Sequence, residues 1–355
     1  MGHIPIVNQE TLQRVINEGC ISIRGTLKDH IVKTIADLFA DALTTRVGDL
    51  VFPWIIGSKN SENLGFKYIF KVADKPYFVR GDEYPIKIPL EEIGEEYGIP
   101  LSEEEALDLW DGKPLWNIIG KKSLGRGRSL SHQTKMEDNK LIDILKRKNN
   151  GSSAKTISLN RYSGRGVPIT INPSQVGTTD FRSALSSFKP EDRLKNIQLN
   201  SIPWQKEGVF TEEKVLEAWL MENIDKPSCN NLRQIIIPSG QHIEWFSNYL
   251  PYGVQGSNID VVISHLNGDH IVSVIELKVG RLSSNGIIDA AKQVEKYSVF
   301  IKKAFRAFNV NVDVKSIIIS RSNPARRNNN SWRHLPITSI VYDIQSSGAV
   351  NFAKE

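Results

Sequence analysis

Residues 257–280, SNIDVVISHLNGDHIVSVIELKVG, hold two apolar segments separated by the turn sequence Asn-Gly-Asp. Apolar segments on either side of an Asn-Gly pair are typical of a β-hairpin. The second segment carries Glu276 and Lys278, and residues two apart on a strand project to the same face. Burying a carboxylate and an ammonium group is costly unless each has a partner. The stretch therefore predicts a hairpin with charged groups on an otherwise apolar strand.

The other strand of the hairpin offers a second acid, Asp260. If the loop consists of the three residues 267–269, the two residues of each cross-strand pair have numbers that add up to 536. In that register Asp260 lies opposite Glu276. Two carboxylates this close repel each other unless a divalent cation lies between them. A two-residue loop would pair Asp260 with Ile275, and the site would need a bend. The alternative is a hairpin whose cross-strand ion pair lies on the surface.

The spacing of these charges, Asp260 followed after an apolar strand by Glu276-Leu277-Lys278, resembles the PD-(D/E)XK nuclease superfamily, with Ile259 where that family often has proline. In the family the two acids hold Mg²⁺ and the lysine orients or activates the attacking water. The resemblance implies that Asp260 and Glu276 are metal ligands and that Lys278 is catalytic. It also implies Mg²⁺ as the cofactor, with Mn²⁺ as a substitute.

A predicted helix after the hairpin, Ile287 to Phe305, carries Gln293 and Tyr297 one turn apart. This arrangement is similar to the Gln-x3-Tyr element of the RecB-like branch of the superfamily. The order of the charged and polar residues looks like that of the NucS/EndoMS-like archaeal nucleases, and the resemblance covers roughly residues 206–325. It implies catalytic roles for Asp260, Glu276, Lys278, Glu213, Gln293 and Tyr297.

Glu213 lies on a predicted helix that precedes the hairpin, Thr211 to Asn223. The RecB-like branch often has a further acid on this helix, and Glu212 and Glu217 are rivals for that role. The alternative is that Glu213 is a first-turn acid, which interacts favourably with the helix dipole. The sequence does not decide among the three glutamates.

The N-terminal part of the chain has a different character, with several short aromatic strands. They are similar to the small barrels of the PUA/EVE/YTH-like group, which bind RNA or modified bases in an aromatic pocket. The resemblance implies that Trp54 and Trp116, with Tyr68, Tyr77 and Trp110, line such a pocket; the alternative is an ordinary core. Strands are expected at 50–56, 65–72, 77–80 and 84–90, and helices over most of 1–45 and from about 135 to 148. Farther along the chain, strands are expected at 234–238, 241–246 and 315–319.

A basic, glycine-rich stretch follows at residues 121–128, GKKSLGRGRS in context. It contains no acid, so it can approach and neutralise a phosphate backbone closely. The predicted nucleic-acid contacts are Lys121, Lys122, Arg126 and Arg128. The alternative is a solvated loop.

Length and composition fit a two-domain globular protein. The 355 residues include 40% hydrophobic and 24% charged residues, and the net charge of +5 is compatible with a polyanionic partner. Two cysteines far apart favour a reducing, cytoplasmic setting, and no apolar run is long enough to span a membrane. We expect residues 1–150 to be a reader domain, 151–205 a linker, and 206–355 a nuclease domain.

The expected fold class combines α/β and α+β elements: a small barrel-like domain with helices, then a mixed sheet flanked by helices. The expected function is that of an Mg²⁺-dependent endodeoxyribonuclease, a restriction enzyme whose N-terminal domain recognises duplex DNA, with a modified base as one candidate feature. Sequence-specific cutting of plain DNA, mismatched or branched-DNA repair of the NucS type, and non-catalytic nucleic-acid binding are the alternatives. Double-strand cutting in this family usually uses two active sites, which makes a homodimer plausible.

Overall fold

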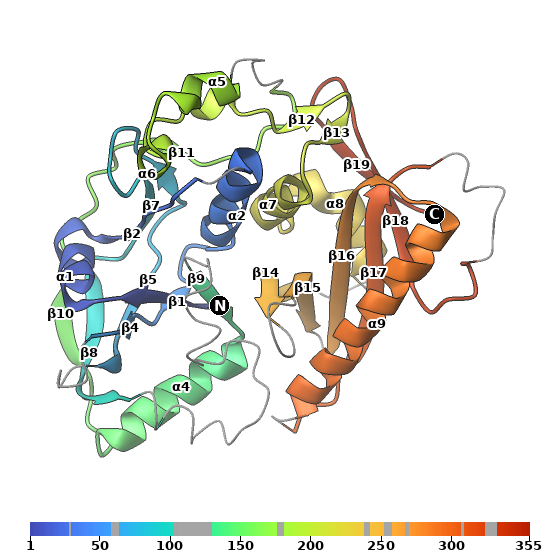
Figure 1. Ribbon diagram of the computed structural model, residues 1–355. Coiled ribbons are helices and arrows are strands. Elements are labelled where there is room, and N and C mark those ends of the chain that lie inside the picture. The colour runs from blue at the N-terminus through green and yellow to red at the C-terminus, as the bar shows by residue number, and fades with distance from the viewer. Residues whose placement is uncertain are drawn as a thin grey trace. The chain divides into compact units, whose positions relative to one another are not determined.

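Figure 1 shows the protein as a computed structural model. The structure describes residues 1–27, 30–57, 64–102, 105, 130–175, 181–237, 242–251, 258–266, 270–306, 309–323 and 332–355. The chain divides into two compact units. The first unit comprises residues 1–26, 41–169 and 190–196, and the second comprises 27–40, 170–189 and 197–355. These limits differ from the expected ones, because residues 27–40 join the second unit and the expected linker is divided between both.

The second unit is built on a mixed six-stranded sheet with the order β14-β15-β16-β17-β18-β19. Its first three strands pair antiparallel, β16, β17 and β18 pair parallel, and β19 returns antiparallel. Strands β18 and β19, near the C-terminus, were not expected from the sequence. The strands are β14 (His242–Pro251), β15 (Asn258–Leu266), β16 (Ile271–Arg281), β17 (Asp313–Arg321), β18 (Thr338–Ile344) and β19 (Val350–Lys354).

The hairpin of β15 and β16 has the predicted register. Its pairs run from His265 opposite Ile271 to Val261 opposite Ile275, and the residue numbers of each pair add up to 536. The alternative pairing of Asp260 with Ile275 is therefore wrong, because Ile275 pairs with Val261. Both strands lie inside the sheet, so their apolar residues are buried on both faces, and β-branched side chains pack well there.

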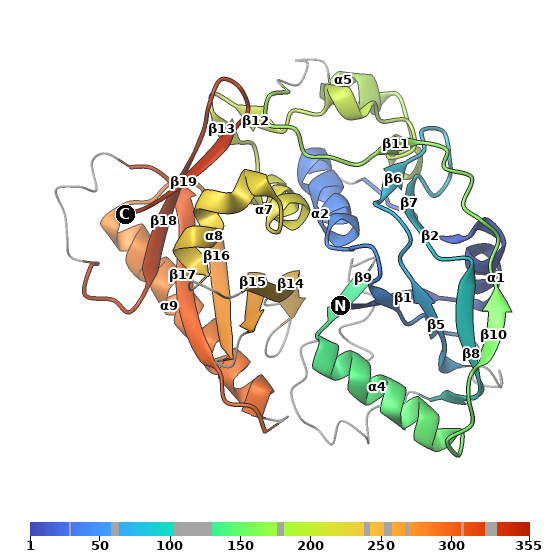
Figure 2. The ribbon, with the colours of Figure 1, turned by 180° about the vertical axis from the view of Figure 1, so that it is seen from behind.

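Helices cover both faces of this sheet. Helix α9 (Ser284–Arg306) crosses one face beside β16 and β17, whereas α8 (Asn230–Ile236) lies on the other (Figures 1 and 2). Helix α7 (Glu213–Asn223), followed by the 3₁₀ turn η2 (Pro227–Cys229), contacts β14 and β16. The strand expected at residues 234–238 is wrong, because α8 continues through Ile236 and buries Leu232 and Ile236 one turn apart.

Helix α2 (Ile31–Leu43) lies where the sequence predicts a helix, but most of it belongs to the second unit. Its Phe39 ring lies 6.0 Å from the ring of the buried Trp204, measured between centroids. This packing joins an N-terminal segment to the sheet of the second unit. The remaining elements of this unit are α5 (Phe181–Ser186), η1 (Leu199–Ser201), β12 (Gln205–Lys206) and β13 (Val209–Phe210).

Within the described residues the first unit contains two sheets, and an isolated β-bridge links Val72 to Leu90 at the ends of β5 and β7. The larger has the order β10-β8-β5-β3-β1-β4, with β9 on β1, and the smaller has the order β11-β6-β7-β2. The larger contains β1 (Gly2–Val7), β3 (Leu50–Val51), β4 (Trp54–Ile55), β5 (Gly65–Lys71), β8 (Ile93–Leu101), β9 (Leu130–Gln133) and β10 (Lys155–Ser158). The smaller contains β2 (Cys20–Ile23), β6 (Tyr77–Phe78), β7 (Ile86–Pro89) and β11 (Val167–Pro168).

Three helices complete the described part of the first unit: α1 (Gln9–Glu18), α4 (Lys135–Lys148) and α6 (Pro190–Arg193). The expectation of a mostly helical N-terminus missed β1 and β2, which are too short to show a clear alternation. The strand expected over 50–56 is present in two pieces, since Pro53 has no N–H to donate to a ladder. Helix α4 has the predicted bounds, and its first turn is held by a capping box of Thr134 and Glu137.

A buried polar cluster lies beneath α4. His3 Nε2 lies 2.8 Å from Asp49 Oδ2, and His3 Nδ1 lies 2.8 Å from His132 Nδ1. Asp138 is only 2% exposed. Burial, reinforced by the nearby Glu137 carboxylate, raises the pKa of Asp138 to about 8. The folded protein therefore keeps a proton on Asp138 at a pH where the unfolded chain has released it.

We expect Asp138→Asn to reduce the pH dependence of stability. An acid whose folded pKa is raised binds more protons in the folded state, so its contribution to stability is lost as pH rises from about 4 to about 8. The variant should lose this component, on the order of 1 kcal/mol per pH unit. Urea unfolding at several pH values measures it, with Asp143→Asn, an exposed acid on the same helix, as control. Equal pH slopes for wild type and Asp138→Asn would contradict the prediction.

Among the helices that the structure describes, none is both long enough and apolar enough to span a membrane.

Candidate active site

Asp260 lies on β15, one residue beyond the last registered pair of the hairpin. Its Oδ2 accepts a hydrogen bond of 2.8 Å from the backbone N–H of Leu277 on β16. Its Oδ1 has no hydrogen bond within the described residues. Burial, and then the charge of Glu276, raises the pKa of Asp260 to about 7. The carboxylate is therefore fixed in position, and it lies close enough to Glu276 for the two negative charges to interact.

Glu276 lies in the middle of β16 and is 1% exposed. Its Oε1 lies 2.7 Å from Lys278 Nζ, and its Oε2 accepts a hydrogen bond of 3.0 Å from the hydroxyl of Tyr297. Both carboxylate oxygens are thus engaged, one by a charge and one by a donor. This pairing offsets the cost of burying the carboxylate.

Gln293 and Tyr297 are four residues apart on α9 and meet on one face of the helix. The Gln293 side-chain amide donates to the Tyr297 hydroxyl, which in turn donates to Glu276. Burial and the charge of Glu276 raise the pKa of Tyr297, so it remains a hydrogen-bond donor. The structure thus connects three of the sequence-predicted residues in one chain of hydrogen bonds.

Lys278 lies two residues along β16 from Glu276, on the same face. Its Nζ lies 2.7 Å from Glu276 Oε1 and 3.5 Å from Glu213 Oε1 on α7. Burial lowers the pKa of Lys278, but the neighbouring carboxylates, Glu276 first, outweigh this and raise it. Lys278 is therefore a charged ammonium group held between a buried acid and an exposed one.

A second group of charges, the Lys214 cluster, is formed by Lys214, Glu217, Asp37 and Asn248. Lys214 Nζ lies 2.7 Å from Glu217 Oε2 and 3.2 Å from Asp37 Oδ1, and Glu217 Oε1 accepts a 3.0 Å bond from Asn248 Nδ2. Burial raises the pKa of Glu217 to about 7, with a contribution from the charge of Asp260. The cluster is thus electrically coupled to the hairpin acids.

The Lys214 cluster was largely missed by the sequence analysis. Glu217 was named there as a rival acid, and its spacing of four residues from Glu213 places both on one side of α7. Asp37 carried no such signal, since it comes from α2, far earlier in the chain. Glu212, the other rival, is the N-cap residue of α7, and its side chain makes no capping hydrogen bond.

The acids Asp260 and Glu276 do not belong to a complete cage for a metal. Within the described residues, no three His, Cys, Asp or Glu side chains are grouped closely enough to hold an ion. Mg²⁺ is commonly bound through one or two carboxylates, with water and substrate oxygens as its other ligands. Two carboxylates whose charges repel, one with an unengaged oxygen, fit that kind of site.

Most of the residues predicted to contact nucleic acid lie outside the described part of the chain, and Trp54 is buried. Lys121, Lys122, Arg126, Arg128 and Trp116 lie outside the described residues, as does Trp110. Trp54 is 6% exposed, and its ring packs edge-on against Phe66 with centroids 4.7 Å apart. Its burial places it in the core of the first unit, rather than at a surface that could stack on a base. Tyr68 also points to a local partner, donating to Glu96 over 3.1 Å.

Comparison with models of known protein families gives no match, and comparison with curated protein sequences gives none either.

Proposed function

We propose that the second unit hydrolyses phosphodiester bonds in DNA, in the manner of a PD-(D/E)XK nuclease. One observation carries the proposal: the hairpin places Asp260, Glu276 and Lys278 together on adjacent strands, in the predicted register. A surface ion pair, the alternative reading of the hairpin, does not fit a glutamate that is 1% exposed. Buried acids beside a lysine are more typical of a reacting centre than of a surface strand.

In this proposal Asp260 and Glu276 hold Mg²⁺. The ion would offset the charge of the scissile phosphate and make a water more acidic. Glu276 is kept in position by Tyr297 and Gln293, and Asp260 by the backbone of Leu277. Lys278, anchored by Glu276, is the group that orients the attacking water and stabilises negative charge as it develops.

The coupling of the Lys214 cluster to Asp260 favours Glu217 over Glu213 as the third acid. Glu217 is buried and its charge interacts with that of Asp260, whereas Glu213 is half exposed and pairs with Lys278. Glu217→Gln should slow cleavage about tenfold or more, since one buried charge beside the site is lost. Glu213→Gln is the matched comparison on the same helix, and single-turnover cleavage rates distinguish them. A larger loss in Glu213→Gln would reverse the assignment.

The first unit is the proposed DNA reader. The support for this is the net charge of +5 and the basic stretch at 121–128, together with a two-sheet unit that carries the aromatic strands expected from the sequence. A restriction enzyme that recognises a feature of duplex DNA, with a modified base as the leading candidate, fits this division of labour. The reader and the site would then act on the same duplex.

The test is cleavage by the full chain of plain duplex, 5-methylcytosine duplex, and mismatched or branched duplex, with Mg²⁺ or with EDTA. Mg²⁺-dependent cutting supports the nuclease, and preference for methylated duplex supports the modified-base reader. Preference for mismatched or branched DNA would instead favour a repair nuclease. DNA binding without cutting of any of these substrates, in Mg²⁺ or Mn²⁺, would contradict the proposal and favour a non-catalytic binding protein.

Tyr297→Phe should lower the cleavage rate about tenfold at saturating Mg²⁺, because Glu276 loses a hydrogen bond made to its charged form. Tyr342→Phe is a matched control, since Tyr342 is also a buried tyrosine of this unit, but its hydroxyl donates to the Val279 carbonyl oxygen 2.9 Å away. We expect both variants to be destabilised to a similar extent. A cleavage rate equally reduced in both would show that Tyr297 acts only through folding.

A further inference from the structure

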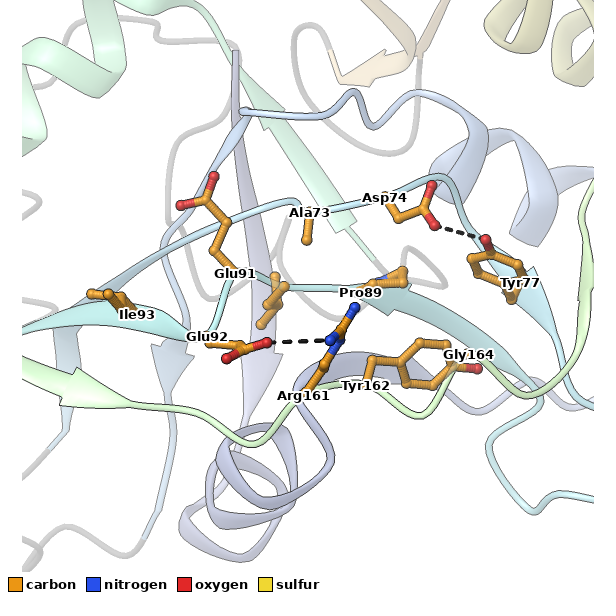
Figure 3. Close-up of a pocket in the computed structure, with 11 residues that line it drawn as sticks. Ala73, Asp74, Tyr77, Pro89, Glu91, Glu92, Ile93, Arg161, Tyr162 and Gly164 are labelled. Atoms are coloured by element: carbon orange, nitrogen blue, oxygen red, sulfur yellow. Dashed lines mark hydrogen bonds and ion pairs between the residues drawn. The ribbon is translucent and has the colours of Figure 1, made fainter.

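The first unit contains a cavity of about 620 Å³ (Figure 3). Its walls come from the loop after β5, from β6 and β7, from the start of β8, and from the segment after β10. All of these elements belong to the first unit, so the cavity is separate from the candidate active site. Its volume is in the range of small-molecule sites.

One wall of the cavity is aromatic. The rings of Tyr77 and Tyr162 lie 6.0 Å apart between centroids, with their planes inclined at 41°. Their hydroxyls are already engaged: Tyr77 donates to Asp74 Oδ2 over 2.7 Å, and Tyr162 donates to the carbonyl oxygen of Arg165. What the pair offers to a ligand is therefore ring surface. Since the two rings form a single inclined wall, they do not make a parallel slot for a flat base.

The charge of the cavity is negative. Three carboxylates line it, those of Asp74, Glu91 and Glu92, against the one guanidinium of Arg161. The Glu91 carboxylate makes no hydrogen bond or ion pair within the described residues, and Figure 3 shows it directed away from the other labelled acids. A phosphate would be repelled here, whereas a cation would be attracted both by the carboxylates and by the faces of the tyrosine rings.

Arg161, the cationic residue on the lining, is largely exposed rather than enclosed by the cavity. Its side chain reaches between Glu92 and Tyr162 toward Pro89 (Figure 3). Its Nε lies 3.7 Å from Glu92 Oε1, and the side chain is 87% exposed. A contact this long and this exposed contributes little to stability. The chain's own guanidinium is therefore weakly held, and a ligand could displace it.

We propose that this cavity binds an organic cation, a guanidinium or alkylammonium group, supplied by an arginine side chain of a partner polypeptide or by a free polyamine. The ring faces of Tyr77 and Tyr162 contact the cation, and Glu92, which lies beside Tyr162 in Figure 3, pairs with it. Arg161 acts as a competitor that the ligand moves aside. The proposal goes beyond the nuclease function and does not depend on it, because no residue of the hairpin takes part.

The test is isothermal titration calorimetry of the full chain with N-acetyl-arginine amide, spermidine, and cytidine, at low and high salt. N-acetyl-citrulline amide, which has the shape of the arginine probe but no charge, is the matched ligand control. We expect the arginine probe to bind and the citrulline probe not to bind, with affinity falling as salt rises. Spermidine binding alone identifies a polyamine as the source of the cation, and arginine binding alone identifies a polypeptide.

Substitutions of residues that line the cavity test whether the cation binds there. Glu92→Gln and Tyr162→Ala should each weaken cation binding about five- to tenfold, whereas Tyr162→Phe, which keeps the ring, should bind like wild type. Glu95→Gln, an exposed acid of β8 outside the cavity, is the matched control. Arg161→Ala should strengthen cation binding, because a competing like charge is removed.

Two results would overturn the proposal. One is binding of cytidine, weakened in Arg161→Ala, without binding of either cation, which would make the cavity a nucleobase site. The other is the absence of binding by the arginine probe and by spermidine at millimolar concentration in both wild type and Arg161→Ala. Neither result bears on DNA cleavage, so failure here is distinguishable from failure of the proposed nuclease.

Discussion

Asp260→Asn is expected to lower Mg²⁺-dependent DNA cleavage by about 10³-fold or more, because a site with two carboxylates loses one of its charges. The variant is chosen to keep the fold. An asparagine oxygen can still accept from the Leu277 N–H, and the change removes a partly buried carboxyl group whose pKa is raised to about 7. We therefore expect the free energy of unfolding at pH 8 to be equal to that of wild type or higher.

The matched control is Asp289→Asn, which changes an exposed acid on α9 that pairs with its neighbour Lys292. It should cut DNA at the wild-type rate. Single-turnover cleavage of a labelled duplex measures both variants, and calorimetric titration of Mg²⁺ into the DNA-free protein measures metal binding. Retention of full cleavage by Asp260→Asn would remove Asp260 from the site and with it the nuclease assignment of the hairpin.

Lys278→Met is expected to lower the cleavage rate by about 10²- to 10³-fold while DNA affinity changes little. The lysine is held against Glu276 at 2.7 Å, so its charge acts at the reacting centre rather than along the DNA. Lys292→Met, which removes an exposed lysine from α9, is the control. Fluorescence anisotropy gives the affinity and single-turnover cleavage gives the rate.

Folding must be followed in parallel for this variant. Removing Lys278 leaves Glu276 buried with the Tyr297 hydroxyl as its remaining strong partner, and breaking a buried pair costs about 3–5 kcal/mol. Lys278→Arg keeps the charge and should be more stable than Lys278→Met. If a folded Lys278→Met cuts DNA at the wild-type rate, the charges of the hairpin are structural, and a non-catalytic binding protein becomes the better interpretation.

The hairpin could be predicted because two strong local signals agree. The apolar strands require burial on both faces, and the register expected for a three-residue loop brings Asp260 toward Glu276. Helix α9 was also predictable from its 3.6-residue pattern. By contrast, the strand expected at 234–238 is wrong, because a run of isoleucines does not distinguish a strand from the last turn of a helix such as α8.

The Lys214 cluster could not be predicted as a whole, because one of its acids comes from elsewhere in the chain. Spacing on α7 brings Lys214 and Glu217 together, but no local pattern indicates that Asp37 completes the group. Trp54 illustrates a different difficulty, because its local sequence pattern fits two kinds of environment. An aromatic residue in a short strand has the same sequence signature whether it lines a pocket or packs against Phe66 in a core.

The assignment of residues 27–40 to the second unit has a practical consequence for anyone who wishes to make the two halves separately. A fragment that begins at residue 206 would lack Asp37, leaving the Lys214 ammonium with one acid fewer, and would lose both rings of the contact between Phe39 and Trp204. No single cleavage point yields both halves intact, because the polypeptide passes from one to the other more than once. Expression of the halves therefore calls for a circularly permuted or split design that carries helix α2 with the sheet.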